Sequence, residues 1–233
     1  MCGSLSGYRS WEEIRDWYAL IPSESGITAD QKTSAVVRPT ELQPFIRLSG
    51  PERILDLGVW GFPPLKGRTS PLSNTRCETM DVLPTFQESF LHRRCVVPVT
   101  GYYEFKQEVD GSKTPWHFSI RGSNTRHGAA VGEGGTHLFG LAGLYMVDRV
   151  RKQRRFSILT TEPNDIAAEV HDRMPVILDD MGMRVWLSPD TGPDGHKRLC
   201  QPYNGPDLIA EPVSKALHKR PKANGEYQFS LGL

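Results

Sequence analysis

The second residue of the chain, Cys2, carries the most distinctive chemistry in the sequence. Removal of Met1 by an aminopeptidase would leave a cysteine whose free α-amine and thiol stand on adjacent carbons. The amine has a reference pKa of about 7.7–8.0, so it is substantially neutral at physiological pH and can add to an aldehyde. The thiol can then close onto the same carbon and form a five-membered thiazolidine. The position also fits an incidental cysteine, because a single motif residue is a weak signal.

A polar segment at residues 73–79 holds the next candidates. Asn74 can orient a carbonyl or hydroxyl group, and the planar guanidinium of Arg76 is suited to binding phosphate. The same residues fit an ordinary surface loop with an Arg76–Glu78 pair. The segment alone leaves both interpretations open.

The third candidate is a glutamate that is flanked by aromatic residues and follows an apolar run. Glu104 stands between Tyr103 and Phe105, after residues 95–99 and a turn at Gly101. Burial among aromatic side chains raises the pKa of a carboxyl group and suits it to acid–base work. Alternation along a strand equally fits an exposed Glu104 between two inward aromatic residues.

His171 is the fourth candidate, followed by Asp172, Arg173, Met174 and Pro175. Histidine can act as an acid–base group because its unperturbed pKa lies nearest neutrality. It also fits a favourable charge at the carboxyl end of a helix. The other histidines show no paired zinc spacing, so we expect no metal site and no cofactor.

Short apolar runs bounded by glycine, proline or charge predict a multi-stranded sheet or barrel that must position these side chains. The runs are residues 54–60, 95–99, 116–120, 138–145 and 156–160. A capping box at Ser10 and Glu13 predicts a helix over 11–20, and a second helix is predicted from Thr161 to His171. We expect an α+β fold, a mostly β single domain with a sheet- or barrel-like core and a few flanking helices.

Composition sets limits on the class of protein. The 28 basic and 27 acidic groups give a formal net charge of +1, which excludes a uniformly polycationic coat for nucleic acid but not one basic face. The basic run from Arg149 to Arg155 fits either a solvated hairpin or a phosphate track. We expect one domain over residues 1–233, with residues 122–136 as a flexible insertion.

Cellular location follows from what the sequence lacks. No apolar run approaches the roughly 20 residues needed to cross a bilayer, and charges interrupt the first twenty positions. The 4 cysteines are too few and too scattered for a disulfide scaffold. We expect a reduced monomer away from membranes, not secreted: cytoplasmic and nucleoid-associated in a bacterium, nuclear in a eukaryote.

Taken in order, these segments resemble the SRAP family, named for an SOS-response-associated peptidase domain. The combination is specific although no single piece is, and it spans nearly the whole chain. The matching residues are Met1-Cys2-Gly3, Trp60-Gly61-Phe62, Asn74 with Arg76, Glu78 and Thr79, Arg94 through Phe105, His171 with Arg173 and Pro175, and Pro212-Val213-Ser214.

The resemblance implies a protein that senses and shields abasic sites in single-stranded DNA, through a thiazolidine crosslink between Cys2 and the ring-opened sugar. It implies that Asn74 positions the sugar or the cysteine amine, and that Glu104 transfers protons. His171 would assist sugar-ring opening and Schiff-base chemistry. The residues expected to contact DNA are Arg76, Arg173, Trp60, Phe105 and Met174. Single-stranded DNA that contains abasic sites is then the expected partner.

The sequence departs from the family at two places. Ser4 stands where arginine is usual, and Leu65 and Lys66 occupy a stretch that often holds tryptophan. Because stacking of one base on an aromatic side chain is worth about 1–3 kcal/mol, we expect weaker DNA affinity. Two alternatives stay open: a cysteine peptidase or autopeptidase that uses Cys2, and a non-catalytic module that binds single-stranded DNA.

Overall fold

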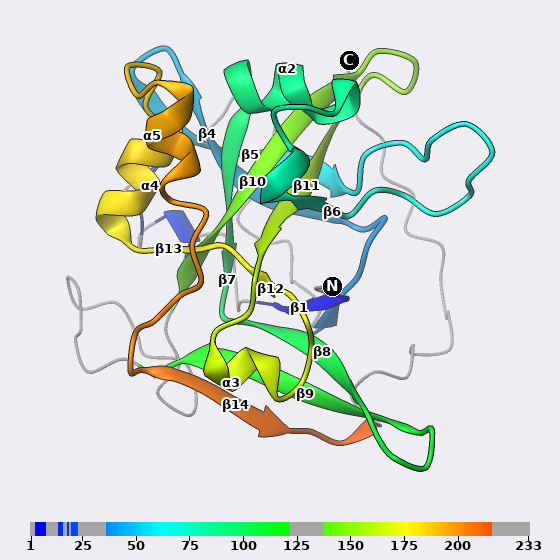
Figure 1. Cartoon of the computed structure of the whole chain (residues 1–233). Helices are drawn as coiled ribbons and strands as arrows, with labels where there is room; N and C mark the ends of the chain where they lie inside the picture. Colours follow the sequence, from blue (N-terminus) through cyan, green and yellow to red (C-terminus); the bar gives the residue numbers. More distant parts are fainter. Residues whose placement is uncertain are drawn as a thin grey trace.

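The computed structural model describes residues 3–7, 14–15, 18, 20–22, 36–121 and 138–215. Strands dominate this part of the chain, and the helices are short (Figure 1). The predicted α+β, mostly β architecture with a barrel-like core and a few flanking helices is confirmed. The predicted insertion at residues 122–136 lies outside the described residues, as does most of the helix expected over 11–20; within that helix Ile14, Arg15 and Tyr18 are helical.

Five strands close into a barrel, namely β4 (Leu42–Ser49), β5 (Glu52–Trp60), β7 (Arg94–Val99), β10 (Phe139–Asp148) and β11 (Gln153–Thr161). Adjacent strands are antiparallel around the ring, except where β11 pairs in parallel with β5. The parallel ladder sets Phe156 opposite Trp60 and completes the ring. A closed ring leaves none of these five strands as an exposed edge.

Short strands extend the barrel at its flanks. β2 (Ile21–Pro22) pairs with β5, and β13 (Ile177–Leu178) pairs with β10. β6 (Asn74–Arg76) and β12 (Met174–Pro175) both pair with the end of β11, where Thr160 is opposite Arg76 on one side and Pro175 on the other. The end of β11 therefore holds two segments that are about a hundred residues apart in the chain.

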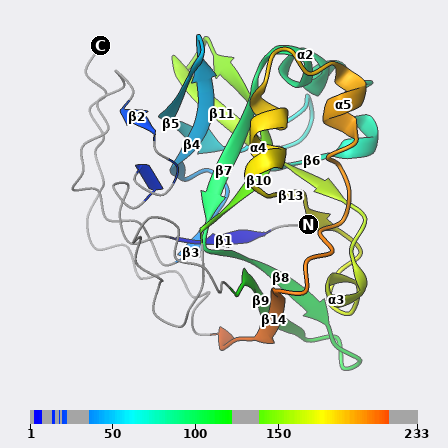
Figure 2. The same ribbon diagram turned by 90° about the vertical axis from the view of Figure 1, so that its left-hand side faces the viewer.

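A second sheet has the order β14 (Leu208–Pro212), β9 (Lys113–Ile120), β8 (Gly101–Gln107), β1 (Ser4–Ser6) and β3 (Val36–Val37). β7 continues directly into β8, so the chain passes from the barrel into this sheet at Thr100. Figure 2 shows β1 lying beside β8, and in the strand order β1 stands between β8 and β3. This sheet fixes the position of Ser4–Ser6 relative to β8.

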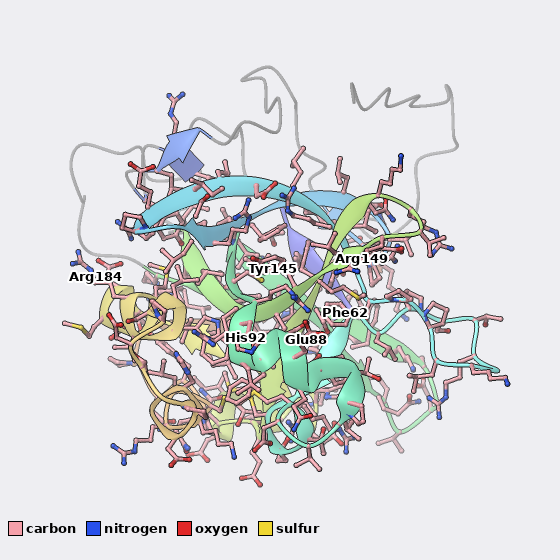
Figure 3. The ribbon with its side chains drawn as sticks, turned by 90° about the horizontal axis from the view of Figure 1, so that it is seen from above. Phe62, Glu88, His92, Tyr145, Arg149 and Arg184 are labelled. Atoms are coloured by element: carbon pink, nitrogen blue, oxygen red, sulfur yellow. The ribbon has the colours of Figure 1, made fainter. Side chains whose placement is uncertain are left out.

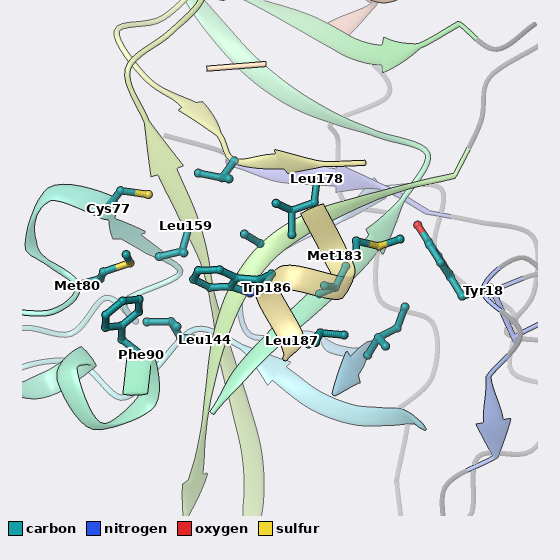
Figure 4. Close-up of a cluster of buried hydrophobic side chains, with 14 of the residues drawn as sticks. Tyr18, Cys77, Met80, Phe90, Leu144, Leu159, Leu178, Met183, Trp186 and Leu187 are labelled. Atoms are coloured by element: carbon teal, nitrogen blue, oxygen red, sulfur yellow. The ribbon is translucent and has the colours of Figure 1, made fainter. Parts of the chain in front are cut away.

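Short helical segments flank the two sheets (Figure 1). They are η1 (Cys77–Thr79), α2 (Pro84–His92), α3 (Asp165–Ala168), α4 (Asp180–Leu187) and α5 (Pro193–Lys197). Trp186 of α4 is fully buried and donates its indole N–H to the carbonyl of Cys95 at 3.0 Å. Around it pack Phe90, Leu144 and Leu159 from α2 and the barrel (Figure 4). This cluster fixes α2 and α4 on the barrel wall, whereas α3 packs on β14 of the second sheet.

The helix predicted from Thr161 begins later than the sequence suggests. Thr161 is the last residue of β11, and Asn164 caps α3 by accepting the N–H of Ala167 at 2.8 Å. An asparagine side chain competes well for a free N–H at a helix start, which explains the boundary. α2 and α4 were not predicted, although Pro84 stands at the first turn of α2, a favoured position for proline.

Candidate active site

The strand β8 carries Glu104 and is also hydrogen-bonded to the first described residue of the chain, Gly3. Gly3 donates its N–H to the carbonyl of Tyr103 at 3.4 Å, and Ser4 pairs with Tyr103 in the ladder. Cys2 precedes Gly3 in the chain and lies outside the described residues. Glu104 follows Tyr103 directly, so the first described residue lies beside the strand segment that carries this carboxylate.

Glu104 is buried, with 3% of its surface exposed, which decides between the two orientations left open by the sequence. Burial raises the pKa of its carboxyl group to about 7, and the nearby negative charge of Asp172 acts in the same direction. A carboxyl group that titrates near neutrality can both accept and donate a proton at physiological pH.

His171 lies one turn beyond α3, where its N–H bonds to the carbonyl of Ala167 at 2.9 Å. Its Nδ1 accepts the backbone N–H of Arg173 at 3.1 Å and lies 2.8 Å from a carboxylate oxygen of Asp172. Partial burial lowers the pKa of His171, and the charge of Asp172 opposes that shift. With Nδ1 accepting, the neutral ring carries its proton on Nε2, whereas protonation of Nδ1 would favour Asp172.

Arg173 ties the His171 segment to the segment after β6. Its guanidinium donates to both carboxylate oxygens of Glu78, at 2.6 and 2.9 Å, and to the carbonyl of Thr160 at 2.6 Å. The hydrogen bonds from Arg173 lower the pKa of Glu78 and keep it ionised. This fork therefore joins two of the predicted site segments across β11.

Asn74 and Arg76 occupy the ends of β6. Asn74 is half-buried and donates to the hydroxyl of Ser73 at 3.3 Å, while Arg76 is exposed. Both line a cavity of about 770 Å³ between the residue 65–73 loop and the start of α2. Among the described residues Arg76 forms no ion pair, so its cation is available to a ligand.

Comparison with known protein families places the chain. The family model described as SOS response associated peptidase (SRAP) matches residues 1–220. The chain belongs to the SRAP family. The abasic site processing protein YoqW of Bacillus subtilis (strain 168) is 32% identical over 235 residues, which cover 96% of this chain and 96% of the relative. The abasic site processing protein YedK of Escherichia coli (strain K12) is 25% identical over 167 residues, 70% of this chain and 69% of the relative.

Solved structures share the SRAP chain's architecture. A protein from Bacteroides thetaiotaomicron has a TM-score of 0.76 at 22% identity, covering 95% of this chain and 97% of that one. A phage-related protein from Bordetella bronchiseptica has a TM-score of 0.66 at 22% identity, covering 92% of this chain and 95% of that one. At this identity the likeness concerns the fold.

Three further SRAP motif residues differ in exposure. Trp60 is fully buried and donates its indole N–H to the carbonyl of Ser73 at 2.9 Å, so it packs behind the strand that carries Asn74. Met174 is fully buried, and its sulfur accepts the N–H of Asn164. Neither side chain has surface to offer to DNA in this structure. Phe105 is partly exposed, so its side chain does have surface for a contact with DNA.

The two departures from the SRAP pattern have different surroundings. Ser4 is 3% exposed and lies in β1 against β8, so this position faces the interior. Leu65 is 46% exposed and lines the cavity that Asn74 and Arg76 share. The apolar surface of Leu65 therefore stands at the opening of that cavity, where the family often has an aromatic ring.

The basic run does not form a continuous phosphate track. Arg155 is buried and donates to the carbonyl of Gly61 at 2.6 Å, and Arg154 pairs with Asp56 at 3.2 Å. Arg149 remains exposed in the β10–β11 turn, on the side of the molecule that carries α2 (Figure 3). The nine residues of β11 span about 30 Å, so this turn lies far from the Arg173 end of the strand.

Sequence reasoning missed three contributors to the site. Asp172 acts on the titration of both Glu104 and His171, and its place between two motif residues was the available signal. The sequence offered Glu78 only as a surface partner of Arg76, in one of two open interpretations, whereas it pairs with Arg173. The Thr160 carbonyl carries no sequence signal, because any residue supplies a carbonyl.

The described residues hold neither a metal-binding cluster nor a membrane-spanning helix. Ranges 3–7, 36–121 and 138–215, with the few described residues between them, hold no group of three or more His, Cys, Asp or Glu side chains arranged to hold a metal ion. In the same part of the chain no helix is long and apolar enough to cross a membrane.

Proposed function

We propose that this SRAP protein senses and shields abasic sites in single-stranded DNA by forming a covalent crosslink through Cys2 after removal of Met1. Relatives that cover nearly the whole chain are named abasic site processing proteins. The observation that carries the proposal is the buried Glu104, whose carboxyl group has a pKa of about 7. Glu104 lies on β8, the strand to which Gly3 is hydrogen-bonded, and the charge of Asp172, next to His171, acts on it.

The crosslink forms in two steps from the aldehyde of the ring-opened sugar. The α-amine of Cys2 forms a bond to the C1′ carbon, and loss of water leaves a protonated Schiff base. The thiol then gives up its proton and bonds to the same carbon, so the imine electrons return to nitrogen. The product is a thiazolidine, and one water is released for each crosslink.

The described residues supply the proton transfers. Glu104 takes the proton that the amine loses on addition and returns a proton to the departing hydroxyl, which a pKa of about 7 permits. His171, neutral because burial lowers its pKa, presents Nε2 to the sugar oxygen during ring opening. Asn74 orients the sugar from the end of β6.

The side chains that contact DNA are those exposed to solvent. Arg76 binds a phosphate beside the cavity it shares with Asn74, and Phe105 offers a partly exposed ring to a base. Arg173 acts on DNA indirectly, since its fork is occupied by Glu78. We propose that the protein is a monomer with a single domain, in which residues 122–136 form an insertion. It acts on DNA in the nucleoid of a bacterium or in the nucleus of a eukaryote.

The test uses two single-stranded oligonucleotides of the same sequence. One contains a natural abasic site, and its control contains a tetrahydrofuran analogue that lacks the hydroxyl needed to open to an aldehyde. After denaturing electrophoresis we expect a protein–DNA adduct with the first and none with the second. Equal adduct with both, or none with either from protein verified to begin at Cys2, contradicts the proposal.

The family's description as a peptidase favours a second candidate, hydrolysis by the Cys2 thiol with His171 and Glu104. This activity should cleave peptides in the absence of DNA and should not need the α-amine. A non-catalytic binding module would retain both oligonucleotides equally and yield no adduct. The electrophoresis experiment, run beside a peptide digest, separates the three.

A further inference from the structure

Two cysteines outside the proposed crosslinking chemistry lie against each other. Cys77 begins η1 and belongs to the hydrophobic cluster around Trp186, against which Cys200, which follows α5, packs. The Cys200 thiol donates to the carbonyl of His196 at 4.0 Å. Neither forms a disulfide in this structure. Both line a cavity of about 330 Å³, in which Cys77 is 8% exposed and Cys200 is half-buried. A reagent from solvent therefore meets Cys200 first.

The backbones on both sides of this pair are fastened independently of the thiols. Lys197 of α5 forms an ion pair with Asp81, two residues beyond η1. Thr161 of β11 donates its hydroxyl to the carbonyl of Cys200 at 3.2 Å. Because neighbouring contacts already hold the two segments together, closing a bond between the sulfurs needs only a local movement.

We propose that Cys77 and Cys200 form an oxidisable dithiol site whose substrate is a small-molecule disulfide. The Cys200 thiol loses its proton and bonds to one sulfur of the reagent, releasing the other half as a thiol. The Cys77 thiol then loses its proton and bonds to the Cys200 sulfur, releasing the second half. The two protein thiols are oxidised to one disulfide, and one reagent disulfide is reduced to two thiols.

The order of attack follows from the surroundings. The neighbouring Cys200 thiol and burial both raise the pKa of the Cys77 thiol, so it is a poor first nucleophile. Cys77 becomes effective once Cys200 carries a mixed disulfide, because the target sulfur is then next to it. Cys95, which is fully buried beneath Trp186, should stay unreacted and serve as an internal reference.

The experiment uses the full chain carrying Cys2→Ser, so that the cysteines at 77, 95 and 200 alone remain. After exposure to oxidised glutathione, we expect a mass lower by two hydrogens and a proteolytic peptide pair joined between Cys77 and Cys200. Cys95 should be alkylated only after denaturation. A stable glutathione adduct on Cys200 without a bridge, or no reaction at all, overturns the proposal.

Two variants sharpen the result. Cys77→Ala should stop the reaction at the mixed disulfide on Cys200, whereas Cys200→Ser should leave Cys77 unmodified. If Cys200→Ser takes up glutathione on Cys77 as fast as Cys77→Ala does on Cys200, the assigned order is wrong. The parent protein carries the decisive measurement, so the outcome stands even where one variant fails to fold.

Discussion

Arg173 donates to both carboxylate oxygens of Glu78, at 2.6 and 2.9 Å, across 95 positions of sequence. Glu78 lies two residues after Arg76, and Arg173 lies two residues after His171. A third hydrogen bond to the carbonyl of Thr160 fixes this guanidinium on the end of β11. This one side chain therefore ties the segment of the proposed phosphate contact to that of the proposed acid–base histidine, in addition to the pairing of β6 and β12 with β11.

Glu78→Gln should slow adduct formation with little effect on folding. Glutamine cannot accept two charge-assisted hydrogen bonds, so Arg173 and the His171 segment lose their fixed position. Because the Glu78 side chain is 49% exposed, we expect a loss of only about 0.2–1 kcal/mol in unfolding free energy. Denaturant unfolding and the single-turnover rate on abasic single-stranded DNA measure the two effects.

The matched control is Glu88→Gln, which breaks the 2.7 Å ion pair between Glu88 of α2 and Arg93, the residue that follows α2. That pair lies on the surface, away from the carboxyl end of β11 where Arg173 is bound, so the adduct rate should stay at the parent value. If both variants react alike, the Arg173–Glu78 fork has no positioning role.

Four of the five barrel strands could be predicted from sequence, because runs such as residues 54–60 and 156–160 are mostly apolar and bounded by charge or turn residues. The fifth, β4, was not predicted. Glu104 and His171 could be named as candidates from the sequence, since each stands in a motif. The partner of Arg173 could not be predicted, because it depends on β6 and β12 flanking the same strand. The burial of Trp60 and Met174 likewise follows from tertiary packing in the hydrophobic cluster they share rather than from local spacing.

Glu104→Gln should flatten the pH dependence of stability. The folded pKa of Glu104 is about 7, above the ordinary value of 4.5, so the folded state binds its proton more tightly than the unfolded state does. This contribution is fully present below pH 4.5 and is lost as pH rises to about 7, by up to about 3 kcal/mol. The measurement is unfolding free energy from pH 5 to 8 for both proteins.

Asp172→Asn provides the second arm of this experiment. The charge of Asp172 raises the pKa of both Glu104 and His171, so its removal should shift both titrations to lower pH. The pH profile of the adduct rate should move in that direction as a whole. Movement of one limb alone would show that Asp172 faces only one of the two groups.

Arg76→Ala should weaken binding to single-stranded DNA and reduce its dependence on salt. One phosphate contact contributes about 0.7 to the slope of log affinity against log salt. Arg149→Ala is the control, because Arg149 is exposed at the opposite end of β11. Titrations at several salt concentrations should show the loss of slope for the first variant alone; an equal loss for Arg149→Ala would place DNA on the hairpin turn.

Blocking the α-amine should abolish the crosslink even though the thiol remains. A short uncleavable tag ahead of Cys2 turns the amine into an amide, so neither Schiff base nor thiazolidine can form. Cys2→Ser keeps the amine and should give at most a reversible Schiff base, trapped by borohydride but lost on heating. A peptidase thiol tolerates the tag unless access is blocked, and a binding module tolerates both changes. Heat-stable adduct should therefore come only from protein that mass spectrometry shows to begin at Cys2, and abundant heat-stable adduct from protein with its tag still attached would rule out the aminothiol mechanism.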